Sequence, residues 1–124
     1  MALREGLLQK SFSVHEVVQS VTERMHSANP SLNAIVYDYS EQAMDAARQA
    51  DARLARGEPQ RILEGIPVTV KVNVDYEGTP TTNGMPVMAD NTAPGHSPIV
   101  QNLLDAGAII IGKTNTPELS MRVT

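Results

Sequence analysis

The sequence has no cysteine and no tryptophan, and it holds only one phenylalanine and three tyrosines in 124 residues. Without cysteine the chain can form no disulfide, no thiolate nucleophile and no Cys-based zinc site. The scarcity of aromatic side chains leaves no obvious platform for stacking nucleic-acid bases. A net charge of -4 also disfavours binding to a nucleic-acid backbone or to an anionic membrane. We therefore expect no direct contact with nucleic acid and none with a membrane.

Long apolar runs are missing as well. Near the N-terminus, charged and polar residues interrupt the apolar ones at Arg4, Glu5, Lys10 and His15, so no secretory signal is expected there. No later stretch approaches the length needed to span a bilayer. The hydrophobic fraction of 41% and the charged fraction of 19% are typical of a globular protein. These features predict a cytoplasmic protein, with one domain or part of a larger one in this chain.

Helix signals occur at three places. Ser13 and Glu16 form a capping box before apolar residues at helical spacing, and Asn29-Pro30 is expected to end that helix. Ser40 is the expected N-cap of an alanine-rich helix, and Ser97 is the expected N-cap of a third helix. The expected helices span about 13–28, 41–56 and 98–106.

Strand signals define the rest of the fold. Apolar and polar residues alternate over 66–74, which predicts a strand with one buried face, and the wholly apolar run over 108–111 predicts a strand buried on both faces. Residues 34–37 form a shorter strand or an extended connector. Because a helix separates the two main strands, we expect a crossover unit with parallel strands and an α/β fold. A further helix start at Thr116-Pro117-Glu118 indicates that the natural polypeptide continues beyond Thr124.

Several sequence patterns resemble functional sites, but each has a simpler structural explanation. Residues 107–114 satisfy the phosphate-loop pattern, but the four middle residues are too apolar to wrap an anion and are better explained as a strand. Asp75 and Glu77 are close in sequence, yet nothing nearby completes a cation site, and we expect two solvated acids. Solvated or helix-capping roles are expected for the three histidines, His15, His26 and His96.

Lys71 is the residue with the strongest indication of a chemical role. It lies in the expected strand 66–74, directly between Val70 and Val72. A lysine in such a strand is commonly an edge residue that prevents aggregation. Alternatively, its ammonium group points into a closed site beneath the long loop over 77–95, where desolvation makes a lysine a usable base near neutral pH. The residue pattern alone leaves both interpretations open.

Two blocks of the sequence resemble the amidase signature family. The first comprises Gly65-Ile-Pro-Val-Thr-Val-Lys-Val-Asn73 and Gly78-Thr-Pro-Thr-Thr-Asn-Gly84, and it is similar to the family's segment around its catalytic lysine. The second covers 97–119 and resembles the family's next block, in the same order and at a family-like separation. The resemblance extends over nearly the whole chain. It implies that residues 1–124 form the N-terminal part of the amidase-signature fold, a mixed β-sheet core covered by helices.

The resemblance also implies an activity, namely hydrolysis of amide C–N bonds by a serine, cis-serine and lysine triad, with no cofactor and no metal. Lys71 matches the catalytic lysine, which in the family takes a proton that the cis-serine relays from the nucleophilic serine. Backbone N–H groups in a glycine-rich serine segment hold the oxyanion. No Gly-Gly-Ser-Ser-Gly-Gly type segment occurs in these 124 residues. We therefore expect a fragment of an amidase that is inactive alone.

Three other interpretations remain open. The same triad serves a glutamine-dependent amidotransferase subunit, which releases ammonia for transfer to misacylated tRNA. A naturally short, non-catalytic binding or scaffold module would instead fold stably by itself. A phosphate-loop nucleotide binder is the third. Under the leading interpretation, the expected partners are a small-molecule amide substrate and either a second copy of the chain or the missing C-terminal part of the same protein.

Overall fold

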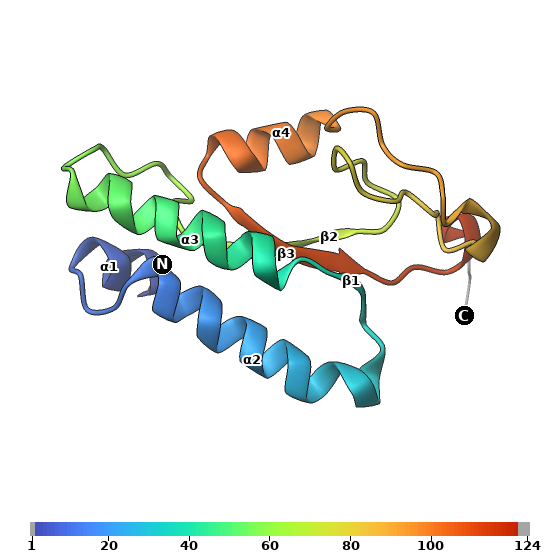
Figure 1. The fold of residues 1–124 in the computed structure, drawn as a ribbon, viewed down its shortest axis with the longest axis horizontal. Helices are drawn as coiled ribbons and strands as arrows, with labels where there is room; N and C mark the ends of the chain where they lie inside the picture. The colour runs from blue at the N-terminus through green and yellow to red at the C-terminus, as the bar shows by residue number, and fades with distance from the viewer. Residues whose placement is uncertain (1, 122–124) are drawn as a thin grey trace.

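The computed structural model describes residues 2–121, in which helices and strands are interspersed (Figure 1). In chain order the elements are α1 (Ala2–Leu8), α2 (Val14–Leu32), β1 (Ile35–Asp38), α3 (Ser40–Ala55), β2 (Pro67–Lys71), η1 (Pro86–Met88), α4 (Pro98–Asp105), β3 (Ile109–Thr114) and η2 (Glu118–Ser120). α1 has no counterpart among the expected elements, and the expected start at Thr116-Pro117-Glu118 forms only the single 3-10 turn η2. Within residues 2–121, every helix is too short or too polar to cross a membrane.

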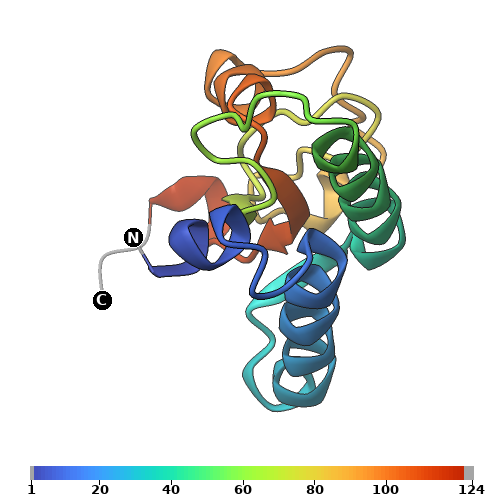
Figure 2. The same ribbon diagram turned by 90° about the vertical axis from the view of Figure 1, so that its left-hand side faces the viewer.

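β3 is the central strand of a three-stranded mixed sheet with the order β1-β3-β2. β1 runs antiparallel to β3, whereas β2 runs parallel to it. The connection from β2 to β3 contains a long loop and α4, as two parallel strands require. Figure 1 and Figure 2 show α4 on one side of the sheet and α2 with α3 on the other. The expected α/β fold with a mixed sheet covered by helices is confirmed.

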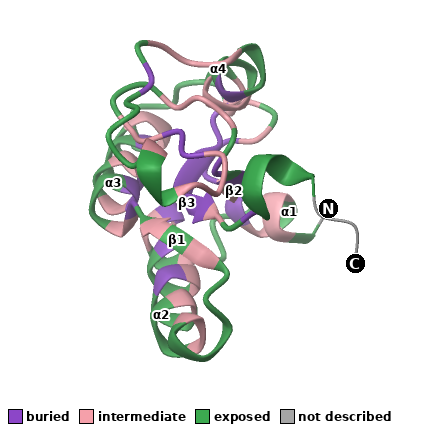
Figure 3. Ribbon diagram, turned by 90° about the vertical axis from the view of Figure 1, so that its right-hand side faces the viewer, coloured by how far each residue is buried: buried purple, intermediate pink, exposed green. Residues whose placement is uncertain are grey.

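The consecutive isoleucines of β3 divide the apolar core between the two faces of the sheet. Ile109 and Ile111 pack with residues of α1, α2 and α3 in one cluster, and Ile110 packs with residues of α4 in the other. Val14 and Val18 of α2 are fully buried in the first cluster. Figure 3 shows that burial is concentrated on β3 and on the helix faces that cover it. Each fully buried valine or isoleucine contributes roughly 1.5–3 kcal/mol, so this apolar run places β3 at the centre.

The pairing of β2 with β3 contains one extra residue on the β3 side. Val68 pairs with Ile110, whereas Val70 pairs with Lys113, so two steps along β2 match three along β3. Such an irregularity changes the face toward which the following side chains point. As a result, Ile110 and Lys113 both point to the α4 side of the sheet.

α2 continues past the expected stop at Asn29-Pro30 and ends at Leu32. Pro30 lacks the N–H that would bond the His26 carbonyl, but both residues are exposed, and water can satisfy that carbonyl. The helix ends because Asn33 adopts the left-handed conformation (φ 48°, ψ 40°) and donates its N–H to the Asn29 carbonyl at 2.7 Å.

The other boundaries also differ from expectation for local reasons. β2 ends at Lys71 rather than near residue 74, because the Val74 N–H bonds the Lys71 carbonyl and closes a turn. β3 continues to Thr114, beyond the expected end at 111, because it pairs with a strand on each side. Ser40 is the first residue of α3 instead of its N-cap, and its N–H donates to the Asp38 carboxylate at 2.8 Å.

Candidate functional site

Lys71 is the last residue of β2, an outer strand of the sheet. Alternation along the strand buries Val70 on the α4 side and leaves Thr69 and Lys71 exposed on the opposite face. The closed environment considered for Lys71 beneath the long loop is therefore not formed by residues 2–121. In this part of the protein Lys71 has the position of an exposed edge-strand residue, and its catalytic role remains a prediction.

The long loop expected over 77–95 extends over 75–97 in the structure, where it is an ordered part of the fold on the α4 side of the sheet (Figure 2). Pro80 pairs with Thr92 in an isolated antiparallel bridge, so the loop folds back on itself. The Ser97 N–H donates to the Asp75 carbonyl at 3.0 Å and closes the loop where α4 begins. These main-chain bonds give the loop a fixed path.

His96 anchors this loop. The Glu77 N–H donates to His96 Nδ1 at 3.1 Å, so the neutral imidazole carries its proton on Nε2. The ring stacks on Tyr76 with a centroid distance of 5.4 Å, and Tyr76 meets Tyr39 edge to face at 5.6 Å. The aromatic contacts thus connect the loop to the end of β1.

The segments that carry the family resemblance meet beside the C-terminal end of β2. The Asn73 side-chain amide donates to the Ser120 hydroxyl at 3.2 Å. The Leu119 N–H donates to the Asn83 carbonyl at 2.7 Å. Residues far apart in sequence, from the β2 end, the loop and the segment after β3, therefore converge on one edge of the sheet.

The loop and the segment after β3 approach each other closely at Gly84. Its φ is 79°, and a Cβ atom there would lie 2.7 Å from the Thr116 carbonyl oxygen, so only glycine fits without strain. A shallow hollow of about 240 Å³ lies beside this contact. Val72, Thr82 and Asn115 are among the residues that line it, so both blocks contribute to its surface.

Lys113, and not Lys71, is the lysine beneath the loop. Its side chain is 0% exposed, and its ammonium group donates to the Pro80 carbonyl at 2.7 Å. Burial lowers the pKa of Lys113 below its usual value, and attraction to the Asp75 carboxylate partly opposes this decrease. Asp75 in turn accepts the Thr81 hydroxyl at 2.7 Å. We call these three side chains, with the Pro80 carbonyl, the Lys113 cluster; it joins the central strand to the loop.

The phosphate-loop pattern over 107–114 folds as the expected strand. Most of it is β3, and the Lys113 ammonium is committed to a loop carbonyl, so neither backbone nor lysine is arranged around an anion. Asp75 is not the solvated acid expected from the sequence, because it is half-buried and accepts the Thr81 hydroxyl. Within residues 2–121, no group of three or more His, Cys, Asp or Glu side chains is placed to hold a metal ion.

Ser40, His26 and Asp38 lie together on the surface but do not have the geometry of a catalytic triad. Asp38 Oδ2 and Ser40 Oγ both approach the same ring nitrogen, His26 Nε2, at 2.6 and 3.0 Å. A Ser-His-Asp triad uses the two different ring nitrogens. Asp38 also accepts the Ser40 hydroxyl and N–H, so this group stabilises the start of α3.

A buried ion-pair network holds the connection from α3 into β2. Glu64 is 0% exposed, and its carboxylate accepts from Arg61 Nε at 2.6 Å and from Arg53 Nη2 at 3.2 Å. Burial by itself would raise the pKa of Glu64, but hydrogen bonds and charge from Arg61, with the charge of Arg53, hold it below its usual value. The next residue, Gly65, donates its N–H to the Gly107 carbonyl at 3.0 Å. The network therefore fixes the point at which β2 enters the sheet.

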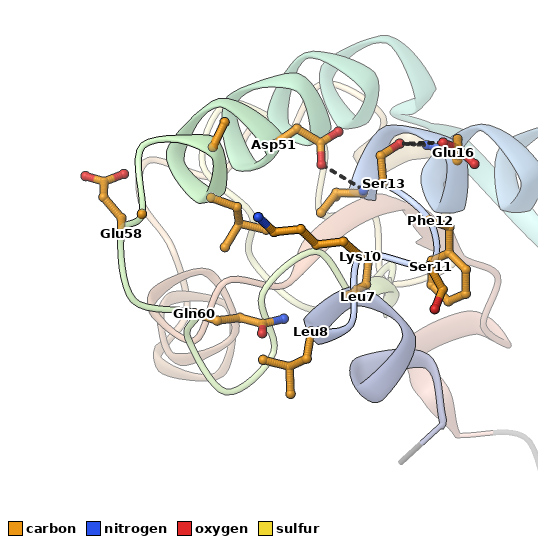
Figure 4. A pocket seen from close by; sticks show the side chains of 14 residues that line it. Leu7, Leu8, Lys10, Ser11, Phe12, Ser13, Glu16, Asp51, Glu58 and Gln60 are labelled. Atoms are coloured by element: carbon orange, nitrogen blue, oxygen red, sulfur yellow. Dashed lines mark hydrogen bonds between the residues drawn. The ribbon is translucent and has the colours of Figure 1, made fainter.

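An open cavity of about 610 Å³ lies between α1, the start of α2 and the end of α3 (Figure 4). Leu7 and Phe12 contribute apolar walls, and the Lys10 side chain also lines it. Asp51 lies at the same cavity and accepts the Val14 N–H at 2.9 Å, which caps α2. The residues that line it belong to neither family-like block, so we do not assign amide chemistry to this cavity.

A family model described as amidase matches residues 16–124, and the chain belongs to the amidase family. The resemblance to the amidase signature family inferred from the two blocks is confirmed. Over 121 residues the chain is 48% identical to the indoleacetamide hydrolase of Bradyrhizobium diazoefficiens, covering 98% of this chain and 22% of that protein. Over 119 residues it is 39% identical to a subunit of the glutamyl-tRNA(Gln) amidotransferase of Trichodesmium erythraeum, covering 96% and 24%.

The solved structures give the same family. A bacterial aryl acylamidase of the amidase signature family is similar with a TM-score of 0.87 and 28% sequence identity. This match covers 93% of the present chain and 24% of the acylamidase chain. The chain thus spans about a quarter of the length of the relatives that it matches.

Sequence reasoning misses both the Lys113 cluster and the buried Glu64. For Lys113 a signal exists, because a lysine two residues after the wholly apolar run 108–111 must either reach water or find a partner when buried. Glu64 has no comparable signal. Its main partners include Arg53 on another element, and only the folded chain brings them together.

Proposed function

We propose that the parent protein hydrolyses amide C–N bonds with a serine, cis-serine and lysine triad, and that Lys71 is its catalytic base. The observation that carries the proposal is the position of Lys71 at the C-terminal end of β2. At this end the family-like segments around Asn73, Asn83 and Leu119 converge. Membership of the amidase family supports the reaction class.

In this proposal, the exposed face of β2 is where both serines must be placed. Proton transfer requires a heavy-atom separation of about 2.6–3.2 Å, or one bridging water, between Lys71 Nζ and a hydroxyl. The remainder of the parent protein must also cover this face, because desolvation disfavours the charged form of lysine and so lets it accept a proton near neutral pH. The nucleophilic serine then attacks the carbonyl carbon, the amine or ammonia leaves with a proton, and water hydrolyses the acyl ester.

The chain by itself supplies the base without the nucleophile, so the proposal predicts no amide hydrolysis by residues 1–124 alone. The parent protein should release ammonia from a small primary amide, and indoleacetamide is the first substrate to test because of the 48% identical relative. Lys71→Met should lower kcat by roughly 10²–10⁴-fold, the usual contribution of a general base.

Lys10→Met is the matched control. Lys10 is exposed and lies outside both family-like blocks, so its loss should leave turnover unchanged. Circular dichroism of both variants checks that the fold is intact. Near-normal turnover in a folded Lys71→Met variant would refute the role of Lys71. Amide hydrolysis by residues 1–124 alone would refute the claim that this chain lacks the nucleophile.

A second candidate function is that of the amide-hydrolysing component of a glutamine-dependent amidotransferase, which the 39% identity to an amidotransferase component supports. That function predicts ammonia release from glutamine, with little hydrolysis of indoleacetamide. Parallel assays with the two amides therefore distinguish the two enzymes. Failure of the parent protein to release ammonia from either amide would count against both candidate functions.

A further inference from the structure

Lys113 is placed where a fully buried lysine is costly. The chain has three lysines, of which Lys10 and Lys71 are exposed, whereas Lys113 is 0% exposed. Burial of an ammonium group loses its hydration, and only specific partners compensate for that loss. An apolar side chain of similar length would fill the same space without this penalty. The geometry of its partners therefore indicates what the charge does.

Those partners belong to one short stretch of the loop. Lys113 Nζ donates to the Pro80 carbonyl at 2.7 Å, and the Asp75 carboxylate accepts the Thr81 hydroxyl at 2.7 Å. From the other side of this stretch, the Asn91 side-chain amide donates to the Thr81 carbonyl at 2.9 Å. The Pro80-Thr81 stretch is thus held both by the central strand and by the returning part of the loop.

The same stretch leads directly to the edge of the sheet at which Lys71 lies. Lys113 pairs with Val70, the neighbour of Lys71 in β2, and the two lysines point to opposite faces. Three residues after Thr81, the chain reaches Gly84, which touches the segment that follows β3. A shift of Pro80 would therefore move the loop beside the end of β2.

We propose that Lys113 is a positioning residue, whose buried ammonium group fixes the 75–84 segment of the loop and so sets the substrate-facing edge beside Lys71. This inference rests on the proposed amide hydrolysis. Lys113 is not a catalytic residue in this scheme, because its side chain lies on the other face of the sheet. Its effect should therefore be on substrate binding and loop order.

The test uses the full-length parent protein and the variant Lys113→Met, with Lys10→Met as the control. Hydrogen–deuterium exchange of peptides from 75–97 should become at least about fivefold faster in Lys113→Met, because Thr81 and Ala93 donate N–H bonds within the loop. KM for the amide should rise about tenfold or more, with kcat changed by less than about threefold and an unchanged pH profile of kcat. The control should change neither exchange nor KM.

Unchanged loop exchange in Lys113→Met would overturn the inference, as would faster exchange with an unchanged KM. If Lys113→Met does not fold, Thr81→Val keeps the lysine and removes only the hydroxyl that Asp75 accepts. Thr81→Val should give the same changes to a smaller degree, and their absence would also overturn the inference. An inactive wild-type parent would refute the proposed function instead, and the exchange measurement would still decide whether Lys113 anchors the loop.

Discussion

Substitution of Glu64 by glutamine removes the buried carboxylate at the centre of the network that holds the entry to β2. Four side-chain hydrogen bonds connect Glu64 with Arg53 and Arg61, at 2.6 to 3.2 Å. Glutamine has nearly the same shape, so the variant leaves no cavity. It cannot accept at both terminal atoms, however, and its NH₂ group must face a guanidinium donor. The expected loss therefore reports on charge and hydrogen bonding rather than on packing.

The magnitude follows from the exposure of the partners. Removal of one member of a buried ion pair costs roughly 3–5 kcal/mol, because the other charge is left without compensation. Here the side chains of Arg53 and Arg61 are 27% and 38% exposed, so water can partly rehydrate them. We therefore expect a loss of about 3 kcal/mol, at the lower end of that range. With a urea m value of about 1.5 kcal/mol/M, the unfolding midpoint would fall by about 2 M.

Urea unfolding of the 124-residue chain at pH 7, followed by circular dichroism, measures this loss. Glu58→Gln is the control, because Glu58 is 45% exposed and pairs with Arg53 and Arg56 at the surface. An exposed ion pair of this kind contributes less than about 1 kcal/mol. Equal losses in the two variants would refute the reasoning from burial.

The dependence on pH provides a second test of the same carboxylate. Since the pKa of Glu64 in the fold lies below its ordinary value of 4.5, its stabilising contribution is present above pH 4.5. It is lost as the pH falls through the folded-state pKa. The stability difference between the wild-type chain and Glu64→Gln should therefore be full at pH 7 and shrink under acidic conditions. A difference that stays constant into the acid range would contradict the assignment to charge.

Three further substitutions test other parts of the fold by thermal unfolding. Gly84→Ala should lower the stability by about 3 kcal/mol, because a left-handed backbone penalty of about 1–2 kcal/mol adds to a steric clash. Gly57→Ala is the control, because its Cβ would meet open space and only the backbone penalty applies. Equal losses in the two variants would contradict the close approach at Gly84. Asp51→Ala removes the carboxylate that accepts two N–H groups at the start of α2 and should cost about 1–2 kcal/mol, so an unchanged midpoint would refute this long-range cap. Val18→Ala, in the core between α2 and the sheet, should cost about 2 kcal/mol, and a neutral result would mean that the core is not close-packed there.

Features that depend on neighbours in sequence were predictable. Ser13 accepts the Glu16 N–H at 3.0 Å and Ser97 accepts the Val100 N–H at 3.4 Å, as the capping patterns indicate. The apolar run over 108–111 likewise predicted a strand buried on both faces, which β3 is. In each case the signal and the structure that it predicts lie within a few residues.

Features that depend on distant partners were not predictable. The stop of α2 is an exception, because Asn33 bonds Asn29 only four residues away and its left-handed cap is a local feature that the expected stop at Asn29-Pro30 missed. The lysine beneath the loop is Lys113 because one extra residue in β3 turns its side chain toward Pro80. The residue pattern indicates only Lys71 as a candidate for a site beneath that loop and leaves its environment open, because which lysine faces the loop depends on strand register.

The central position of β3 has a consequence for synthesis of the protein. Its isoleucines belong to both apolar clusters, and β1 and β2 both pair with it, yet among the strands within residues 2–121 β3 comes last in chain order. A ribosome-bound chain that ends before residue 109 therefore has no completed sheet and neither core. Helices can form early on such a nascent chain, but its tertiary structure must wait until β3 has emerged, which leaves the earlier apolar surfaces in need of protection until then.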